Sequence, residues 1–249
     1  MGRNDLAERV PRRIQPDAIA ECIVEIRFAP QELPEVFLGR LLTSPALKNL
    51  RPVRLPQADI PFSAREADAT LRYQPVYQFD AGNELVRIGT GAISFHVLPP
   101  YPGWDRFYAR AEEIMRGAWA QCGEPPLERC GLRYVNALTS DGHGVRSIDD
   151  LNLSVLVNGQ ELADVSLSFL TSDNENTESM VRVASVKHVQ GEMPANATFA
   201  VDLDIRTTGD VSRWGAAELL RWLTEARKIK NSHFFELLPA RVIKTLEVK

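Results

Sequence analysis

The feature that most constrains the fold of this chain is a repeated alternation of apolar and polar residues. Such alternation is typical of β-strands that have one buried and one solvated face. Weaker versions of the pattern predict strands at 71–79, 84–98, 127–138, 151–158, 163–171 and 179–189. Because many of these segments are joined by connections of hairpin length, we expect antiparallel pairing. The alternation is clearest in 18–28 and 197–207, whose buried faces we expect to be formed by Cys22, Val24, Ile26, Phe28, Phe199, Val201, Leu203 and Ile205.

Two long helices are expected beside these strands. Apolar residues recur with a 3.6-residue period over 104–118 and again in a helix that begins near Ser212. A short helix is predicted after Pro34, and the tail at 233–247 indicates a turn and a closing strand. We therefore predict an α+β fold in which both long helices pack on one face of antiparallel sheet.

The order of the predicted elements suggests how the chain is organised. After an N-terminal arm at 1–17, residues 18–140 contain several strands and one long helix, and residues 145–249 contain a similar set. This similarity predicts two pseudo-duplicated halves that share one architecture.

Glycines and prolines mark two special backbone segments. Gly89 and Gly91 interrupt the strand pattern of 84–98, which predicts a bulge or a close approach of another backbone. Four prolines divide 45–61, which we expect to be a loop that is mobile or faces a partner. The candidate partner contacts on this loop are Arg51 and Arg54.

Charge and hydropathy argue against several function classes. The net charge of −4 gives the chain no overall attraction to a phosphate backbone, so nucleic-acid binding is disfavoured. No apolar stretch reaches the roughly 18 residues that a membrane helix needs, and the first residues lack the apolar region of a signal peptide, so we expect a cytoplasmic protein. The basic residues of the arm, taken as solvated surface, are Arg3, Arg9, Arg12 and Arg13, and the cysteines, taken as reduced packing residues, are Cys22, Cys122 and Cys130.

Several segments resemble a known family. The sequences AECIVEIRF (20–28), YPGWDRF (101–107), GLRYVNAL (131–138) and HFFELL (233–238) are similar to a sporadically distributed prokaryotic conserved-hypothetical family of about this length, marked by an Arg-Tyr-x-Asn strand motif. The resemblance implies no activity, because the family consists of uncharacterised proteins. Its scattered occurrence is the pattern of mobile or defence-associated genes, which include regulators and antitoxin-like partners.

Charged residues on the polar faces of the strands form a candidate ligand site. If the sheet curls into a trough, these side chains would hold a divalent metal or a phosphate. A structural interpretation is that they form cross-strand ion pairs on a solvated face, with Arg133 bound to Glu25. The candidate residues are Glu21, Glu25, Arg27, Arg133, Asp202 and Asp204.

The sequence contains no recognisable catalytic motif. Its four histidines lack metal-site spacing, His143 has no accompanying nucleophile motif, and neither a P-loop nor a GxGxxG pattern implies a nucleotide cofactor. We therefore expect a non-enzymatic binding or regulatory protein that acts through a protein partner, with self-association left open. The alternative is a metal-dependent phosphate-processing enzyme or a nucleotide-binding module. Two tryptophans outside the apolar helical stripes, Trp119 and Trp222, are further candidate partner contacts if they are exposed.

Overall fold

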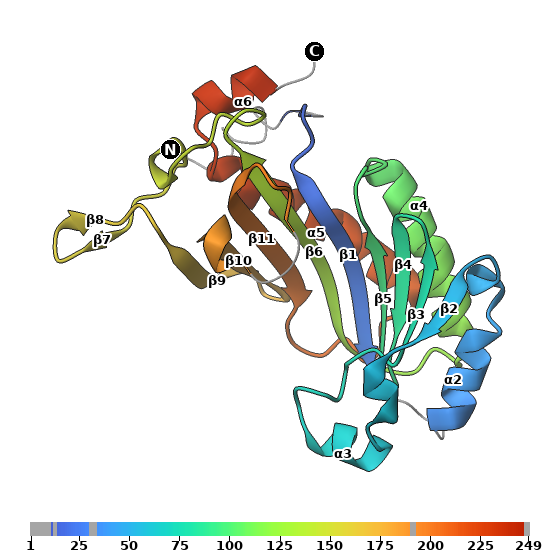
Figure 1. Cartoon of the computed structure of the whole chain (residues 1–249). Helices are drawn as coiled ribbons and strands as arrows, with labels where there is room; N and C mark the ends of the chain where they lie inside the picture. Colours follow the sequence, from blue (N-terminus) through green and yellow to red (C-terminus); the bar gives the residue numbers. More distant parts are fainter. Residues whose placement is uncertain (1–10, 12–13, 30–33, 190–192, 247–249) are drawn as a thin grey trace. The chain divides into compact units, whose positions relative to one another are not determined.

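The protein has an α+β fold with a large antiparallel sheet, as the alternating sequence predicts (Figure 1). The computed structural model describes residues 11, 14–29, 34–189 and 193–246, so the arginines of the N-terminal arm at positions 3, 9, 12 and 13 lie outside the described residues. Within the described ranges, no helix has both the length and the apolar character needed to cross a bilayer. The described α-helices are α2 (Pro34–Leu42), α3 (Phe62–Ala67), α4 (Trp104–Ile114), α5 (Ala216–Glu236) and α6 (Ala240–Leu246).

The chain divides into two compact units, each built from separate stretches of sequence. Unit 1 contains residues 1–21, 133–205 and 225–249, and unit 2 contains residues 22–132 and 206–224. The strand β6 (Leu127–Thr139) and the helix α5 each contribute residues to both units.

The strands of unit 2 follow the hydrogen-bonded order β2-β3-β4-β5-β1. The partners in this run are antiparallel: β2 (Arg51–Arg54), β3 (Tyr77–Ala81), β4 (Glu84–Ile88), β5 (Ala92–Val97) and β1 (Ile19–Phe28). The predicted strand at 84–98 is thus two strands, because residues 89–91 reverse the chain between β4 and β5. As predicted, alternate residues of β1 are fully buried: Cys22, Val24, Ile26 and Phe28.

The close backbone approach predicted for the two glycines is confirmed. A Cβ atom on Gly89 would lie 2.7 Å from the carbonyl oxygen of Gln74, and one on Gly91 would lie 2.9 Å from that of Phe28. Both contacts are with backbone, which cannot rotate away as a side chain can.

We expect Gly89→Ala to lower the free energy of unfolding by about 1–3 kcal/mol, the usual cost of overpacking. Urea denaturation would measure the loss. The matched control is Gly39→Ala in α2, where an added Cβ meets nothing within 4 Å and alanine should stabilise the helix by roughly 0.5–1 kcal/mol. Equal midpoints for the two variants would contradict the prediction.

The proline-rich segment of unit 2 has more structure than the sequence predicts. Residues Pro45–Leu47 and Pro56–Asp59 form short 3₁₀ turns on either side of β2, and Leu47 is almost completely buried. The first turn contacts the π-helical segment Met115–Trp119, which continues α4. The prediction of a loop was therefore wrong: proline removes α-helical hydrogen bonds but is compatible with 3₁₀ turns and edge strands.

Unit 1 contains the other end of the strand series. Its strands β11 (Ala197–Thr207), β10 (Thr177–Ser185) and β9 (Ser166–Asn174) follow one another, and β9 pairs with β10 in an antiparallel register. The apolar face predicted for β11 is buried, as expected. A separate hairpin, β7 (Leu156–Val157) with β8 (Gln160–Glu161), precedes β9 and projects from the rest of this unit in Figure 1.

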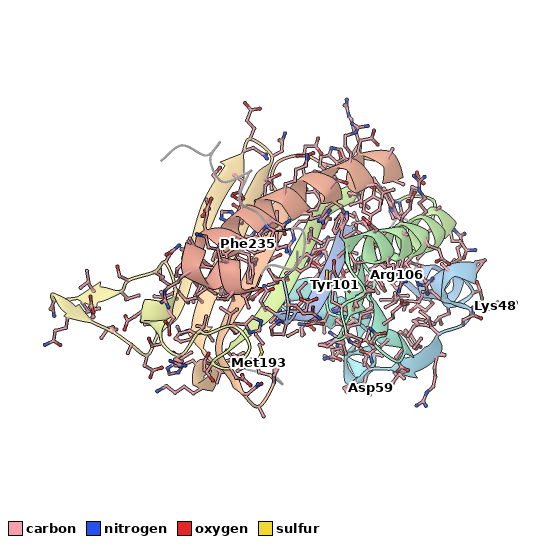
Figure 2. All side chains as sticks on the ribbon, turned by 90° about the horizontal axis from the view of Figure 1, so that it is seen from above. Lys48, Asp59, Tyr101, Arg106, Met193 and Phe235 are labelled. Atoms are coloured by element: carbon pink, nitrogen blue, oxygen red, sulfur yellow. The ribbon has the colours of Figure 1, made fainter. Side chains whose placement is uncertain are left out.

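The C-terminal tail differs from the predicted closing strand. After α5 ends at Glu236, residues Ala240–Leu246 form the helix α6, and Val242 and Leu246, four residues apart, are buried. A pair at this spacing fits one face of a helix, whereas the tail is too short to distinguish the two periods from sequence. Figure 2 shows the C-terminal part of α5, around Phe235, over strands of unit 1.

A candidate binding groove beside strand β9

Two of the predicted ligand residues of unit 1, Arg133 and Asp202, form an ion pair. Arg133 donates two parallel hydrogen bonds to Asp202, from Nε to Oδ1 at 2.7 Å and from its terminal nitrogen to Oδ2 at 2.9 Å. Arg182 on β10 donates to the same Oδ2 at 2.9 Å. The hydrogen bond that Arg133 donates to Asp202 is the main reason that the pKa of Arg133 is raised, and the nearby Asp204 and Glu21 act in the same direction. The carboxylate of Asp202 is thus already occupied by two guanidinium groups.

The predicted ligand residues of unit 2 are also paired. Glu25 accepts hydrogen bonds from Arg27 at 2.8 Å and from Arg129 at 3.3 Å. Arg27 also lies over the ring of Tyr73, 4.6 Å from its centroid. The set of six candidates therefore divides between the two units, and the carboxylate bound to Arg133 is Asp202 rather than the expected Glu25. Within the residues that the structure describes, no group of three or more histidine, cysteine, aspartate or glutamate side chains is arranged to hold a metal ion.

The Arg-Tyr-x-Asn motif has structural partners within unit 1. Tyr134 is buried beneath the Nζ atom of Lys230, which lies 4.1 Å from the ring centroid. Asn136 is buried and donates to the carbonyl oxygen of Val201 at 3.0 Å. It therefore fixes the backbone of the neighbouring strand.

The predicted partner contacts do not form one surface. Trp119 is only 1% exposed and donates from Nε1 to the carbonyl of Pro125, and Trp222 is also buried. Because a buried ring cannot contact a partner, the interface prediction for the two tryptophans is corrected. Arg51 and Arg54 are exposed on β2, where Arg54 binds Asp59.

Exposed apolar side chains instead gather in one stretch of unit 1. Of the seven large hydrophobic residues that are exposed in the described chain, five fall between positions 156 and 170: Leu156, Val157, Leu162, Phe169 and Leu170. The first three lie on or beside the hairpin β7–β8, and the last two lie on β9. Clustered exposed apolar side chains mark interaction sites more often than scattered ones do.

The strand β9 is an edge strand within the described residues, since β10 is its one neighbour in the sheet. Its residues 166–172 contain no charge and no proline, the devices that usually protect an edge from pairing with another chain. Phe169 is 42% exposed and Leu170 is 55% exposed, on opposite faces of the strand. The edge is therefore long and uncharged, and it exposes two large apolar side chains.

An open groove of about 680 Å³ adjoins this edge. Its floor consists of the β9 and β10 side chains that share one face of the strands, and its wall is the C-terminal half of α5. The segment at 152–153 closes one side, where Asn152 donates to the carbonyls of Glu236 and Leu238 at the end of α5. The lining residues are Asn152, Leu153, Phe169, Thr171, Asp173, Asn174, Val181, Glu225, Lys228, Ile229, Ser232, His233, Glu236 and Leu237.

A buried carboxylate joins the floor of the groove to its wall. Asp173 accepts a hydrogen bond from Ser179 at 2.5 Å and lies 2.7 Å from Nε2 of His233 on α5. Its side chain is only 4% exposed. In the β9–β10 register Asn174 pairs with Thr177 and Ser172 pairs with Glu178, so Asp173 is the extra residue of a β-bulge. Bulges often redirect a side chain near a functional site.

The hydrogen bonds among Asp173, Ser179 and His233 indicate which chemical roles these three residues can have. Ser179 donates to the carboxylate and not to the imidazole, so it is not a nucleophile activated by His233. Asp173 favours the tautomer of His233 with a proton on Nε2, which leaves Nδ1 as an acceptor in the neutral ring. The arrangement is suited to fixing the groove and to hydrogen bonding a ligand.

The remaining charges give the groove an excess of carboxylates. Lys228 is paired with Glu225 at 2.8 Å, and Asp173 is paired with His233. Glu236 accepts a hydrogen bond from Ser232 at 2.9 Å but has no ion-pair partner among the described residues. It also lies at the C-terminal end of α5, where the helix dipole adds negative potential.

Asp173, Ser179 and His233 could not be recognised as a site from their sequence patterns. One signal was present: Asp173 is the single charged residue of β9. His233 begins the HFFELL segment quoted for the family resemblance, but sequence gives no indication that it meets a residue 60 positions earlier.

Comparisons with known proteins add no further identification. No protein-family model matches the sequence, and no curated protein matches it either. The family resemblance therefore stays a prediction, and the function has to be inferred from the geometry of the groove.

Proposed function

We propose that this protein is a non-enzymatic binding protein that accepts an extended segment of a partner protein along the edge of β9 that has no neighbouring strand among the described residues. The observation that carries the proposal is the uncharged edge itself, with Phe169 and Leu170 exposed on its two faces. An added strand would pair with the backbone groups on the side of β9 that faces away from β10 and would cover both side chains.

The position of the groove supports an added strand. Alternate side chains of a strand paired with β9 would point toward α5, about 7 Å apart along the strand. The groove lies on that side of β9, as its lining by Phe169, Thr171 and Asp173 shows. Backbone pairing would then provide affinity, and the groove would provide selectivity for particular side chains.

Charge favours a different chain over a second copy of this one. A second copy would present its own β9, whose sequence SLSFLTSDN contains no lysine or arginine. The groove has an excess of carboxylates, so a self-paired β9 would leave the charge of Glu236 without a counterpart.

The broader predictions from sequence belong to the same proposal. A cytoplasmic regulator in a mobile or defence-associated system would fit a protein that works by pairing with another protein. Pseudo-duplicated halves and long helices on a common face of the sheet remain predictions. The phosphate-processing alternative gains no support from Glu25, Arg27, Arg133 and Asp202, because the charges of these four candidates are already paired.

The test is a selection of random extended peptides displayed on phage, followed by anisotropy measurements on the peptides that bind. We expect Leu170→Lys to weaken binding of the selected peptides at least tenfold, because a charge would then interrupt the uncharged edge. The matched control is Leu42→Lys, which changes an exposed leucine on α2 and should leave affinity unchanged.

Two outcomes would overturn the proposal. If the selected peptides bind Leu170→Lys and Leu42→Lys with equal affinity, the binding surface lies away from β9. If instead the protein is a dimer in sedimentation analysis and Leu170→Lys makes it monomeric, the edge is occupied by a second copy.

A further inference from the structure

Given an extended partner segment on β9, we infer that the groove selects a basic side chain, lysine or arginine, on the face of that segment that points toward α5. This inference rests on the proposed function and identifies the chemistry of the partner. It is carried by the geometry and charge of the groove wall.

The groove carries an excess of negative charge. Three carboxylates line it, from Asp173, Glu225 and Glu236, against one lysine and one imidazole. The first two carboxylates are paired inside the groove, whereas Glu236 accepts only a neutral hydroxyl hydrogen bond from Ser232 among the described contacts. A cation that entered the groove would therefore meet a net negative charge.

Glu236 lies on the side of α5 that lines the groove. It lies one helical turn beyond His233 on α5, so it shares the groove-facing side of the helix with the residue that binds Asp173. The side chains of lysine and arginine are long enough to extend from a strand beside β9 and keep an apolar stem against Ile229 or Leu237. The groove offers apolar contact for the stem and a carboxylate for the charged end.

The two-residue period of a strand fixes the spacing between the apolar residue and the basic residue of the partner segment. Phe169, Thr171 and Asp173 alternate along β9 on the groove side. A partner side chain beside Phe169 should be apolar, and the basic residue should follow or precede it by two or four positions, because only even spacings place both on one face. A basic residue at an odd spacing would point to the opposite face.

The experiment uses a peptide that binds in the selection described above. Lysine, norleucine and glutamate are placed at each position in turn, and affinity for the full-length protein is measured by anisotropy. We expect a peptide with lysine to bind about twofold to fivefold more tightly than one with norleucine at one position of even spacing, the gain usual for a partly exposed ion pair. Glutamate at that position should weaken binding.

Variants of the groove identify the carboxylate. Glu236→Gln should remove most of the gain from lysine, and Glu236→Lys should reverse the preference toward glutamate. The control Glu35→Gln, an exposed carboxylate on α2, should leave the preference intact. Circular dichroism spectra confirm that each variant is folded.

The inference and the proposed function fail in different ways. Peptides that bind along β9 with no preference for lysine, or with a preference that Glu236→Gln leaves unchanged, would overturn the inference and leave the function standing. If Leu170→Lys has no effect on any peptide, both are wrong.

Discussion

Replacing Asp173 with alanine is expected to lower the free energy of unfolding by about 3 kcal/mol. The substitution removes the acceptor for the buried hydroxyl of Ser179 and the partner of the His233 imidazole, and both groups would stay largely out of water. Loss of one member of a buried polar pair costs more than the pair contributes, because the other member keeps its desolvation penalty. Equilibrium urea denaturation followed by circular dichroism would measure the loss.

Unit 1 provides a matched control for this change. Asp164 binds His188 at 2.9 Å, much as Asp173 binds His233, but its side chain is 44% exposed. We expect Asp164→Ala to cost less than about 1 kcal/mol, as is usual for exposed ion pairs. If both variants lose a similar free energy of unfolding, burial does not determine how much the Asp173–His233 pair contributes to stability.

Replacing Trp119 with alanine is expected to cost about 3–5 kcal/mol, the range for deletion of a large core aromatic side chain. Trp119 is the last residue of the π-helical segment and is among the largest fully buried side chains. The change would leave a cavity in unit 2 and would also remove the hydrogen bond to Pro125. Thermal and urea denaturation would both report the loss.

The control for Trp119 is Trp104→Ala at the start of α4. Trp104 packs on the rings of Phe107 and Tyr108 but is only half-buried, so less apolar surface returns to water and a smaller loss is expected. A loss from Trp119→Ala no larger than that from Trp104→Ala would contradict the prediction.

The elements with a clear period could be predicted from sequence. The alternation of 18–28 and 197–207 corresponds to β1 and β11, and the helical period of 104–118 corresponds to α4 and the turn that continues it. These segments bury one face, so local pattern and tertiary structure agree. The short tail and the proline-rich segment were predicted incorrectly, since a few apolar residues do not distinguish a helix from a strand or reveal a 3₁₀ turn.

The candidate groove could not be predicted in the same way. Its key contact joins residues 173 and 233, and no local period connects them. The unusual features of β9 were visible in the sequence as a charge-free run that ends at Asp173. What sequence could not supply was that β9 lies at an edge, because strand order depends on pairings between distant segments.

The interleaving of the two units affects how binding regions on this protein can be mapped. The chain passes between the units at 21/22, 132/133, 205/206 and 224/225, and these junctions lie inside β1, β6, β11 and α5. No flexible linker at these points offers a place to cut. A truncation series, the usual first tool for locating an interaction, would split a strand or helix and unfold what remains, and loss of binding would then be mistaken for loss of the binding surface. Single-residue variants of the intact chain are the appropriate probes.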